Sequence, residues 1–257
     1  MKDLSVTIIG SGNVAAFLAR NFHKHGVRVE KIISRNAEKG KVLAAETNAL
    51  WSDDFSSPGS AENIVISAVK DSAANEVWHK LHIENRLLLH TAGTLSLDDL
   101  APFAPARGVL YPLQSISADK AIDSRQVPFL IEANSAENLT KVRSLASLIS
   151  EKITEADSAV RGKLHLAAVF ANNFSNLCFH IAWELAQKEG LDPKLLLPLI
   201  DESCAKLHTL TPAEAQTGPA VRQDKNVMAK HLALLENMPE TAAVYRLLSA
   251  EIYRRKK

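Results

Sequence analysis

The stretch VTIIGSGNVAAFLARNF, residues 6–22, constrains the fold more than any other part of the chain. A short apolar run leads directly into Gly10 and Gly12, and a helix-like pattern follows. The pattern Gly-x-Gly-x-x-Ala, ending at Ala15, is typical of a tight turn between a strand and a helix that pack closely together. The sequence therefore predicts an α/β fold that begins with a strand, a turn and a helix.

Short runs rich in Val, Ile and Leu alternate with polar or helix-patterned segments through the first part of the chain. Several of these runs are apolar without alternation, which is typical of strands covered by helices on both faces. The predicted strands are residues 5–9, 27–33, 64–69, 87–90, 108–111 and 127–132, with short ones near 49–51 and 152–155. We therefore predict a doubly wound, mostly parallel Rossmann sheet over residues 1–155.

The pattern changes after residue 155 to long helical periods. Asp157 or Ser158 could cap a long helix that runs to Gly190, where glycine is well placed as a stop. Three further helices are predicted where proline suits a first turn, at Pro193, Pro212 and Pro239. Residues 156–257 are thus expected to form an all-helical domain.

Charge and composition exclude several partners. The net charge of +1 gives no electrostatic reason to expect nucleic acid or an anionic membrane. The apolar stretch 164–185 is interrupted by asparagine and histidine, so no membrane span is expected. The first apolar run is too short for a secretory signal, and a cytoplasmic location is expected.

Metal and disulfide chemistry are not expected either. Cys178 and Cys204 are too few for a metal quartet and lack the spacing of a redox pair, so we expect buried free thiols. The nine histidines contain no HxxxH or HExxH pair. No metal site is predicted.

The glycine turn predicts a dinucleotide phosphate site formed by Gly10, Ser11, Gly12, Asn13 and Val14. The first glycine permits the turn, and the second lets a pyrophosphate approach the backbone and the N–H groups of the following helix. The alternative is a tight strand-to-helix turn with no ligand.

The end of the second strand favours NADP over NAD. An NAD site usually has an acidic residue there to bind the ribose hydroxyls, whereas this chain has Ser34, Arg35 and Asn36. Arg35 offers a planar cation to a 2′-phosphate, and Ser34 and Asn36 offer hydrogen bonds. Glu30 falls inside the strand, and Arg35 could also be an ordinary solvated arginine.

Ligands of such a sheet bind outside the carboxyl ends of its strands. The residues that follow three predicted strands should therefore face the crevice at the glycine turn. They are Val69 and Lys70, the HTAG segment with Thr91 and Gly93 followed by Thr94, and the YPLQSIS segment with Tyr111 and Gln114. We expect Val69, Thr91 and Gly93 at the cofactor and Tyr111 and Gln114 at the pocket wall; a structural role in the loops is the alternative.

The helical half supplies the candidate catalytic groups. His165, Asn172, Asn173 and Asn176 would share one face of an apolar helix, where polar groups are costly unless partnered or facing a cavity. His165 could donate a proton to a substrate that receives hydride, with Asn172 and Asn173 orienting it. Alternatively, these groups cap helix ends or bind across a subunit interface.

A second polar cluster follows Gly218 and Pro219, which break a helix, and Asp224 can cap the next one. Arg222 is a candidate for binding a substrate carboxylate. An inter-helix turn with a surface arginine is the alternative.

The motifs GSGNVA, SRN, HTAG, YPLQS, HLAAVFANNF and TGPAVRQD together resemble Rossmann-like oxidoreductases with a C-terminal domain of unknown function, number 2520. More distantly, the chain is similar to pyrroline-5-carboxylate reductase and to the coenzyme F420-dependent NADP oxidoreductases. The resemblance implies an NADP-dependent reductase and a homodimer through the helical domain, without a named substrate. The lysine mechanism of the similar hydroxyacid dehydrogenases does not carry over, because Ala167 follows Lys163 at the position of their asparagine.

Two functions remain open. The first is an NADP-dependent oxidoreductase that transfers hydride to a small carbonyl or imine compound, with His165 or Tyr111 as the proton donor. The second is a non-catalytic dinucleotide-binding sensor or interaction module, suggested by the lack of a strong nucleophile or a familiar catalytic spacing. A coenzyme F420 reductase is a variant of the first.

Overall fold

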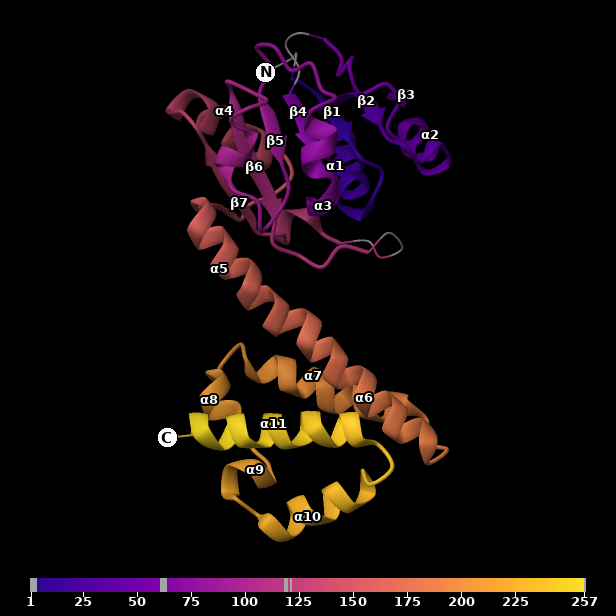
Figure 1. Ribbon diagram of the computed structural model, residues 1–257, viewed down its shortest axis with the longest axis vertical. Coiled ribbons are helices and arrows are strands. Elements are labelled where there is room, and N and C mark those ends of the chain that lie inside the picture. The colour runs from indigo at the N-terminus through magenta and orange to yellow at the C-terminus, as the bar shows by residue number, and fades with distance from the viewer. Residues whose placement is uncertain (1–3, 61–63, 118–119, 121, 257) are drawn as a thin grey trace. The chain divides into compact units, whose positions relative to one another are not determined.

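A single eight-stranded sheet forms the first part of the computed structural model, which describes residues 4–60, 64–117, 120 and 122–256 (Figure 1). Its order is β3-β2-β1-β4-β5-β6-β7-β8. The strands are β1 (Ser5–Ile9), β2 (Arg28–Ile33), β3 (Leu50–Ser52), β4 (Ile64–Ser67), β5 (Leu88–His90), β6 (Arg107–Pro112), β7 (Phe129–Ala133) and β8 (Ile153–Glu155). Only the β6–β7 pairing is antiparallel among these strands. The predicted mostly parallel, doubly wound sheet is confirmed.

Helices cover both faces of the sheet, which explains the continuous apolar strands. One face packs against α1 (Asn13–Lys24), α2 (Ala37–Glu46) and α4 (Ala136–Ser147). The other packs against α3 (Asp71–Trp78) and the 3₁₀ helix η1 (Leu97–Leu100). Neighbouring strand residues serve opposite faces: Ile8 belongs to the first core and Ile9 to the second, and both are fully buried. A short 3₁₀ helix, η2 (Ser124–Gln126), precedes β7.

The strand order reverses at β1, which lies between β2 and β4. The backbone continues these pairings just beyond the strands, where the Gly10 N–H donates to the Ile33 carbonyl at 2.7 Å and the Ala68 N–H donates to the Ile9 carbonyl at 2.8 Å. Such a reversal point opens a crevice at the carboxyl ends of the strands, where open α/β sheets bind ligands. The glycine turn lies at this point.

The long helix predicted up to Gly190 forms as a continuous helical stretch from Ser158 to Lys188, made of two α-helices with a π-helical segment between them. Helix α5 (Ser158–Ala168) is capped by Asp157, whose Oδ1 accepts from the Val160 N–H at 2.8 Å. The π-helical segment Val169–Phe174 follows, and α6 (Ser175–Lys188) comes next. A π-helical turn holds an extra residue, so the α-helical spacing that placed His165 and Asn176 on one face does not apply across it. Gly190 follows α6 with a φ of +70°, as expected for a stop.

The chain divides into two compact units, one ending at Asn172 and the other beginning at Asn173. The boundary expected after residue 155 lies earlier than this division, because α5 is bonded to the sheet through Arg161 and Glu132. The described part of the second unit is helical, as predicted. After α6 it contains η4 (Pro193–Leu196), α7 (Leu197–Lys206), α8 (Pro212–Ala215), α9 (Pro219–Arg222), α10 (Lys225–Leu234) and α11 (Pro239–Arg255).

Both cysteines are exposed free thiols, which corrects the expectation of burial. Cys178 lies on α6 and Cys204 on α7, two helices without a buried side chain. Among the residues that the structure describes, none of the helices is long and apolar enough to cross a membrane.

Candidate functional site

A cavity of about 690 Å³ lies at the carboxyl ends of the strands in the first unit. Its volume is within the range of small-molecule and cofactor sites, roughly 300 to 1,000 Å³. Every residue that the sequence predicted for cofactor binding lines it, together with Tyr111 and His165. These predicted residues are Gly10, Ser11, Gly12, Asn13, Val14, Ser34, Arg35, Asn36, Val69, Thr91 and Gly93. The structure thus brings six separate segments of the sequence together.

The two glycines of the turn meet different demands. Gly10 has a φ of +118°, and a Cβ atom there would lie 2.4 Å from the Ala68 carbonyl oxygen, so only glycine fits. Gly12 has open space where a Cβ would stand, and no side chain caps the following helix α1. The first N–H groups of α1 are therefore left for a ligand at the cavity, as an anion-binding turn requires.

Asn13 connects this turn to the loop after β6. Its Nδ2 donates to the Ile116 carbonyl at 2.9 Å, and both residues line the cavity. The YPLQSIS segment is therefore held beside the first turn of α1. Gln114 does not line the cavity; its Oε1 accepts from the Ser115 N–H at 2.8 Å.

At the end of β2, local structure uses two of the three predicted polar side chains. The Ser34 hydroxyl donates to the Asn36 carbonyl at 3.0 Å and accepts from Trp51 Nε1 at 3.3 Å. The Asn36 side-chain oxygen caps α2 by accepting from the Lys39 N–H at 2.9 Å. Arg35 is exposed and lines the cavity. Of the three side chains, Arg35 is therefore the one whose polar group is not used by these local hydrogen bonds and can bind a ligand.

Glu30 is bound elsewhere, so it does not supply the acidic group of an NAD site at the end of β2. Its two carboxylate oxygens accept from the Ser60 N–H at 2.8 Å and the Ser60 hydroxyl at 2.7 Å. This contact commits the Glu30 carboxylate to Ser60, and Glu30 is not among the residues that line the cavity.

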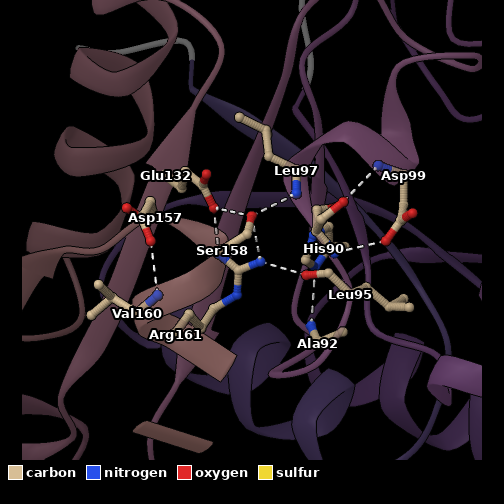
Figure 2. A network of polar contacts seen from close by, with 11 residues as sticks. His90, Ala92, Leu95, Leu97, Asp99, Glu132, Asp157, Ser158, Val160 and Arg161 are labelled. Atoms are coloured by element: carbon tan, nitrogen blue, oxygen red, sulfur yellow. Dashed lines mark hydrogen bonds and ion pairs between the residues drawn. The ribbon is translucent and has the colours of Figure 1, made fainter. Parts of the chain in front are cut away.

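Buried His90 shapes the loop after β5. Its Nδ1 accepts from the Ala92 N–H and its Nε2 donates to the Ser96 carbonyl, both at 3.2 Å (Figure 2). This pair of contacts requires the neutral tautomer with hydrogen on Nε2. Burial, helped by the Arg161 charge, lowers the pKa of His90 to about 4, so the ring is neutral at physiological pH. Sequence reasoning gave His90 no such role.

His165, Tyr111 and Gly93 form one contact cluster at the cavity. The Tyr111 hydroxyl lies 2.9 Å from His165 Nδ1, and the rings meet edge to face at 6.0 Å between centroids. A Cβ atom on Gly93 would lie 2.5 Å from the same Nδ1 atom, so the glycine admits the imidazole. Burial and the Asp71 charge raise the pKa of Tyr111, which keeps its hydroxyl protonated. With Nδ1 occupied by Tyr111, Nε2 is the His165 atom left to meet a substrate.

Asp71 is a cavity residue that the sequence did not predict. It begins α3 and accepts a short hydrogen bond from the Thr94 hydroxyl, so this bond connects the ends of β4 and β5. Phe55 and Lys70 also line the cavity. An acidic residue just after a buried strand was the available signal for Asp71, because strand ends of a parallel sheet share one edge.

The asparagine candidates are placed differently from His165. Asn172 is exposed and is not among the residues that line the cavity. Asn173 is exposed and begins the second unit. Arg222 lies within that unit and is exposed at the end of α9. Their predicted roles therefore stay predictions. Among the described residues, no group of three or more His, Cys, Asp or Glu side chains is placed to hold a metal ion.

Several solved structures resemble this chain. A Bacteroides fragilis protein provisionally assigned as an NADP oxidoreductase is 37% identical over 98% of this chain and 99% of that one, with a TM-score of 0.92. An imine reductase from Myxococcus stipitatus in complex with NADP⁺ is 16% identical over 97% and 92%, with a TM-score of 0.67. The 1-pyrroline-5-carboxylate reductase of Streptococcus pyogenes is 15% identical over 99% and 100%, with a TM-score of 0.62. The last two show a shared fold alone.

Two family descriptions match successive parts of the chain. Residues 5–92 match the NADP oxidoreductase, coenzyme F420-dependent, family, and residues 127–252 match the domain of unknown function 2520. No curated protein sequence matches the chain. The similarity to the Bacteroides protein extends over nearly the whole length of both chains, so it includes both matched parts. The chain therefore belongs to the oxidoreductase family in which an N-terminal domain of the coenzyme F420-dependent NADP oxidoreductase type is followed by the domain of unknown function 2520.

Proposed function

We propose that this protein is an NADP-dependent reductase of a small compound with a C=O or C=N bond. The observation that carries the proposal is the composition of one cavity. The glycine turn with the uncapped start of α1 and the His165–Tyr111 pair both line it. A dinucleotide site and a proton donor are the two parts that a reductase of this kind needs.

The residues present fit a dinucleotide. Gly10 makes the turn, Gly12 leaves space above the backbone, and the N–H groups that begin α1 can bind the pyrophosphate. When bound, the nicotinamide would supply hydride to the carbon of the C=O or C=N bond. Ile116 and Asn13 would enclose the phosphates, because their hydrogen bond holds the loop after β6 beside the turn.

His165 would give the proton that balances the hydride. In the imidazolium form, Nδ1–H donates to the Tyr111 oxygen and Nε2–H faces the substrate oxygen or nitrogen. Transfer of the Nε2 proton leaves a neutral ring that keeps its bond to Tyr111. Tyr111 thus orients the ring through the whole step, and its raised pKa prevents it from ionising.

Arg35 supports NADP over NAD. Its guanidinium is exposed at the cavity, while Glu30, the nearby acid, is occupied by Ser60. A guanidinium can bind a 2′-phosphate through two parallel hydrogen bonds between opposite charges. Its interaction with the uncharged ribose hydroxyls of NAD is weaker.

We also propose a homodimer formed through the second unit. That unit leaves many large apolar side chains exposed, among them Leu195, Leu199 and Leu234, with exposed fractions of 70%, 65% and 81%. Exposed apolar surface of this kind marks an interface. Light scattering should give the mass of two chains, and Leu199→Lys should shift the mass toward one chain; a wild-type monomer at micromolar concentration would exclude the dimer.

The reductase is tested first by binding. NADPH should quench or enhance intrinsic fluorescence near micromolar concentration and bind more tightly than NADH, and failure of both to bind would exclude the proposal. NADPH oxidation is then followed with a cyclic imine and with a ketone as probes. The similarity in fold to imine and pyrroline carboxylate reductases does not favour the non-catalytic sensor. Turnover that disappears in His165→Gln, with NADPH affinity unchanged, would eliminate the sensor.

A further inference from the structure

Arg161 is a fully buried cation on α5, bonded to two other segments of the first unit. Its Nη1 forms an ion pair with Glu132 at the end of β7, and its Nη2 donates to the Leu95 carbonyl in the loop after β5 (Figure 2). Nη2 also donates to the Ser158 hydroxyl oxygen at 3.2 Å. One guanidinium therefore holds a helix, a strand end and a loop together.

Ser158 forms a second set of hydrogen bonds from α5 to β7 and to the segment after β5. Its hydroxyl donates to Glu132 Oε2 at 2.8 Å and accepts from the Leu97 N–H at 2.9 Å (Figure 2). The first turn of α5 is thus bonded to both β7 and the loop after β5 by two side chains. Figure 2 also shows that the start of this loop is fixed by His90, whose Nδ1 accepts from the Ala92 N–H at 3.2 Å.

The position of this network relates it to the candidate proton donor. Arg161 and His165 are four residues apart on α5, so they lie on one face of the helix, one turn apart. Leu95 comes two residues after Gly93, the glycine against which His165 packs. The network therefore holds both sides of the His165–Gly93 contact: the helix that carries the imidazole and the loop that receives it.

Folding stability alone does not require a buried arginine here. Arg161 Nε is buried without a hydrogen-bond partner among the described residues, which is unfavourable. Buried ion pairs also contribute little net stability compared with apolar side chains of similar volume. What an arginine offers instead is geometry, because two separate nitrogens of one rigid planar fork bond Glu132 and Leu95, whereas a lysine has a single nitrogen on a flexible chain.

We propose that Arg161 is a positioning residue that sets the place of the His165 imidazole against Gly93 and Tyr111. The proposal rests on the proposed function for its catalytic meaning, since His165 is there the proton donor. The position of the His165 ring can be measured without substrate or nucleotide. The positioning role of Arg161 and the reductase function can therefore be disproved separately.

The first measurement is nuclear magnetic resonance of the histidine ring nitrogens in the full-length protein, with His165 assigned by its loss in His165→Gln. The second unit supplies an internal reference, because His231 Nδ1 also lies 2.9 Å from a tyrosine hydroxyl, that of Tyr245, in an edge-to-face pair. Arg161→Lys should shift the His165 signals and leave those of His231 in place.

Two further variants separate positioning from folding. Arg161→Met combined with Glu132→Leu removes the buried cation together with its partly buried partner, so the protein should fold while the His165 signals still move. Arg143→Lys is the matched control, because Arg143 forms an exposed ion pair with Glu155. This control should leave the His165 signals unchanged.

The second measurement is kinetic. A displaced proton donor should lower kcat about 10- to 100-fold in Arg161→Lys and leave the affinity for NADPH unchanged. Combined with Gly93→Ala, the losses should be less than multiplicative, because both changes act on one imidazole. Unchanged His165 signals in a folded Arg161→Lys protein, or fully multiplicative losses, would overturn the proposal. Shifted signals without any turnover would support the positioning and count against the reductase.

Discussion

Gly93 and His165 are in such close contact that no side chain fits between them. A Cβ atom built on Gly93 would lie 2.5 Å from Nδ1 and 2.7 Å from Cγ of the imidazole. Gly93 comes from the loop after β5, and His165 from α5, so the contact joins segments far apart in sequence. The glycine is needed for its lack of a side chain, since its backbone conformation is one that other residues adopt.

Gly93→Ala should therefore displace the His165 ring and reduce turnover. We expect kcat to fall about 10- to 100-fold, with the affinity for NADPH less affected, because a small misplacement of a catalytic group has effects of this size. Gly162→Ala on α5 is the matched control: a Cβ there meets nothing within 4 Å. That control should keep its activity and gain about 0.5 to 1 kcal/mol of stability. Equal activity in the two variants would show that the contact has no role in turnover.

Gly10→Ala should destabilise the fold by more than its backbone conformation alone explains. The new Cβ would lie 2.4 Å from the Ala68 carbonyl oxygen at a φ of +118°. Gly26→Ala isolates the conformational cost, because Gly26 has a φ of +80° and open space around it. We expect about 1 to 3 kcal/mol for Gly26→Ala and more for Gly10→Ala, measured by urea unfolding. Equal losses would mean that the carbonyl contact relaxes freely.

Local patterns were sufficient to predict the sheet, and they failed where structure depends on long-range contacts. Apolar runs without alternation identified the buried strands of the sheet, because burial on both faces leaves a direct trace in the residue types. The short strands β3 and β8, which are not buried, were expected near residues 49–51 and 152–155. The rule that strand ends share one edge then gathered the glycine turn, Arg35, Gly93 and Tyr111 around one cavity. Neither step needed tertiary information.

The π-helical segment and the Arg161 network could not be predicted in this way. A π-helical turn has no residue signature in VFANNF, so the predicted polar stripe assumed unbroken α-helical spacing. Arg161 reads as a surface charge, since its partners Glu132 and Leu95 are distant in sequence. Likewise, the number and spacing of Cys178 and Cys204 suggested buried free thiols, but both lie exposed on helices that have no buried side chain within one chain.

Arg35→Ala should weaken NADPH binding selectively. Loss of a charge-assisted contact to the 2′-phosphate should raise the Kd for NADPH about 10- to 100-fold and leave the Kd for NADH nearly unchanged. Arg20→Ala serves as the control, because Arg20 forms an exposed ion pair with Glu46 on the neighbouring helix. Calorimetric titration with both nucleotides measures the ratio. An equal loss for both would assign Arg35 a general phosphate or packing role.

His90 should make the fold sensitive to acid. Its folded pKa of about 4 lies below the ordinary histidine value of 6.5, so the unfolded chain binds more protons between these values. The contribution is complete above the unfolded pKa and is lost as the pH falls toward the folded one. From about pH 7.5 to about pH 4.5 it should remove roughly 2 to 3 kcal/mol.

Urea unfolding at the two pH values checks this sign and size. His90→Asn should lose roughly 2 to 3 kcal/mol less than wild type over the interval, even if it is less stable throughout. His23→Asn, at an exposed position on α1, should show the wild-type pH dependence. A His90→Asn protein with the full wild-type loss would place the acid sensitivity in other groups.

Tyr111→Phe tests whether the hydroxyl orients His165 or the ring merely packs against it. Phenylalanine keeps the edge-to-face ring contact and removes the oxygen 2.9 Å from Nδ1. Because an unheld imidazole can rotate or change tautomer, we expect kcat to fall about 10- to 100-fold with NADPH affinity unchanged. Tyr245→Phe removes the equivalent hydroxyl from the His231 pair and should have little effect. Steady-state kinetics across neutral pH distinguishes the two roles. Full activity in Tyr111→Phe would show that the Tyr111 ring only packs against His165 and that its hydroxyl is not needed.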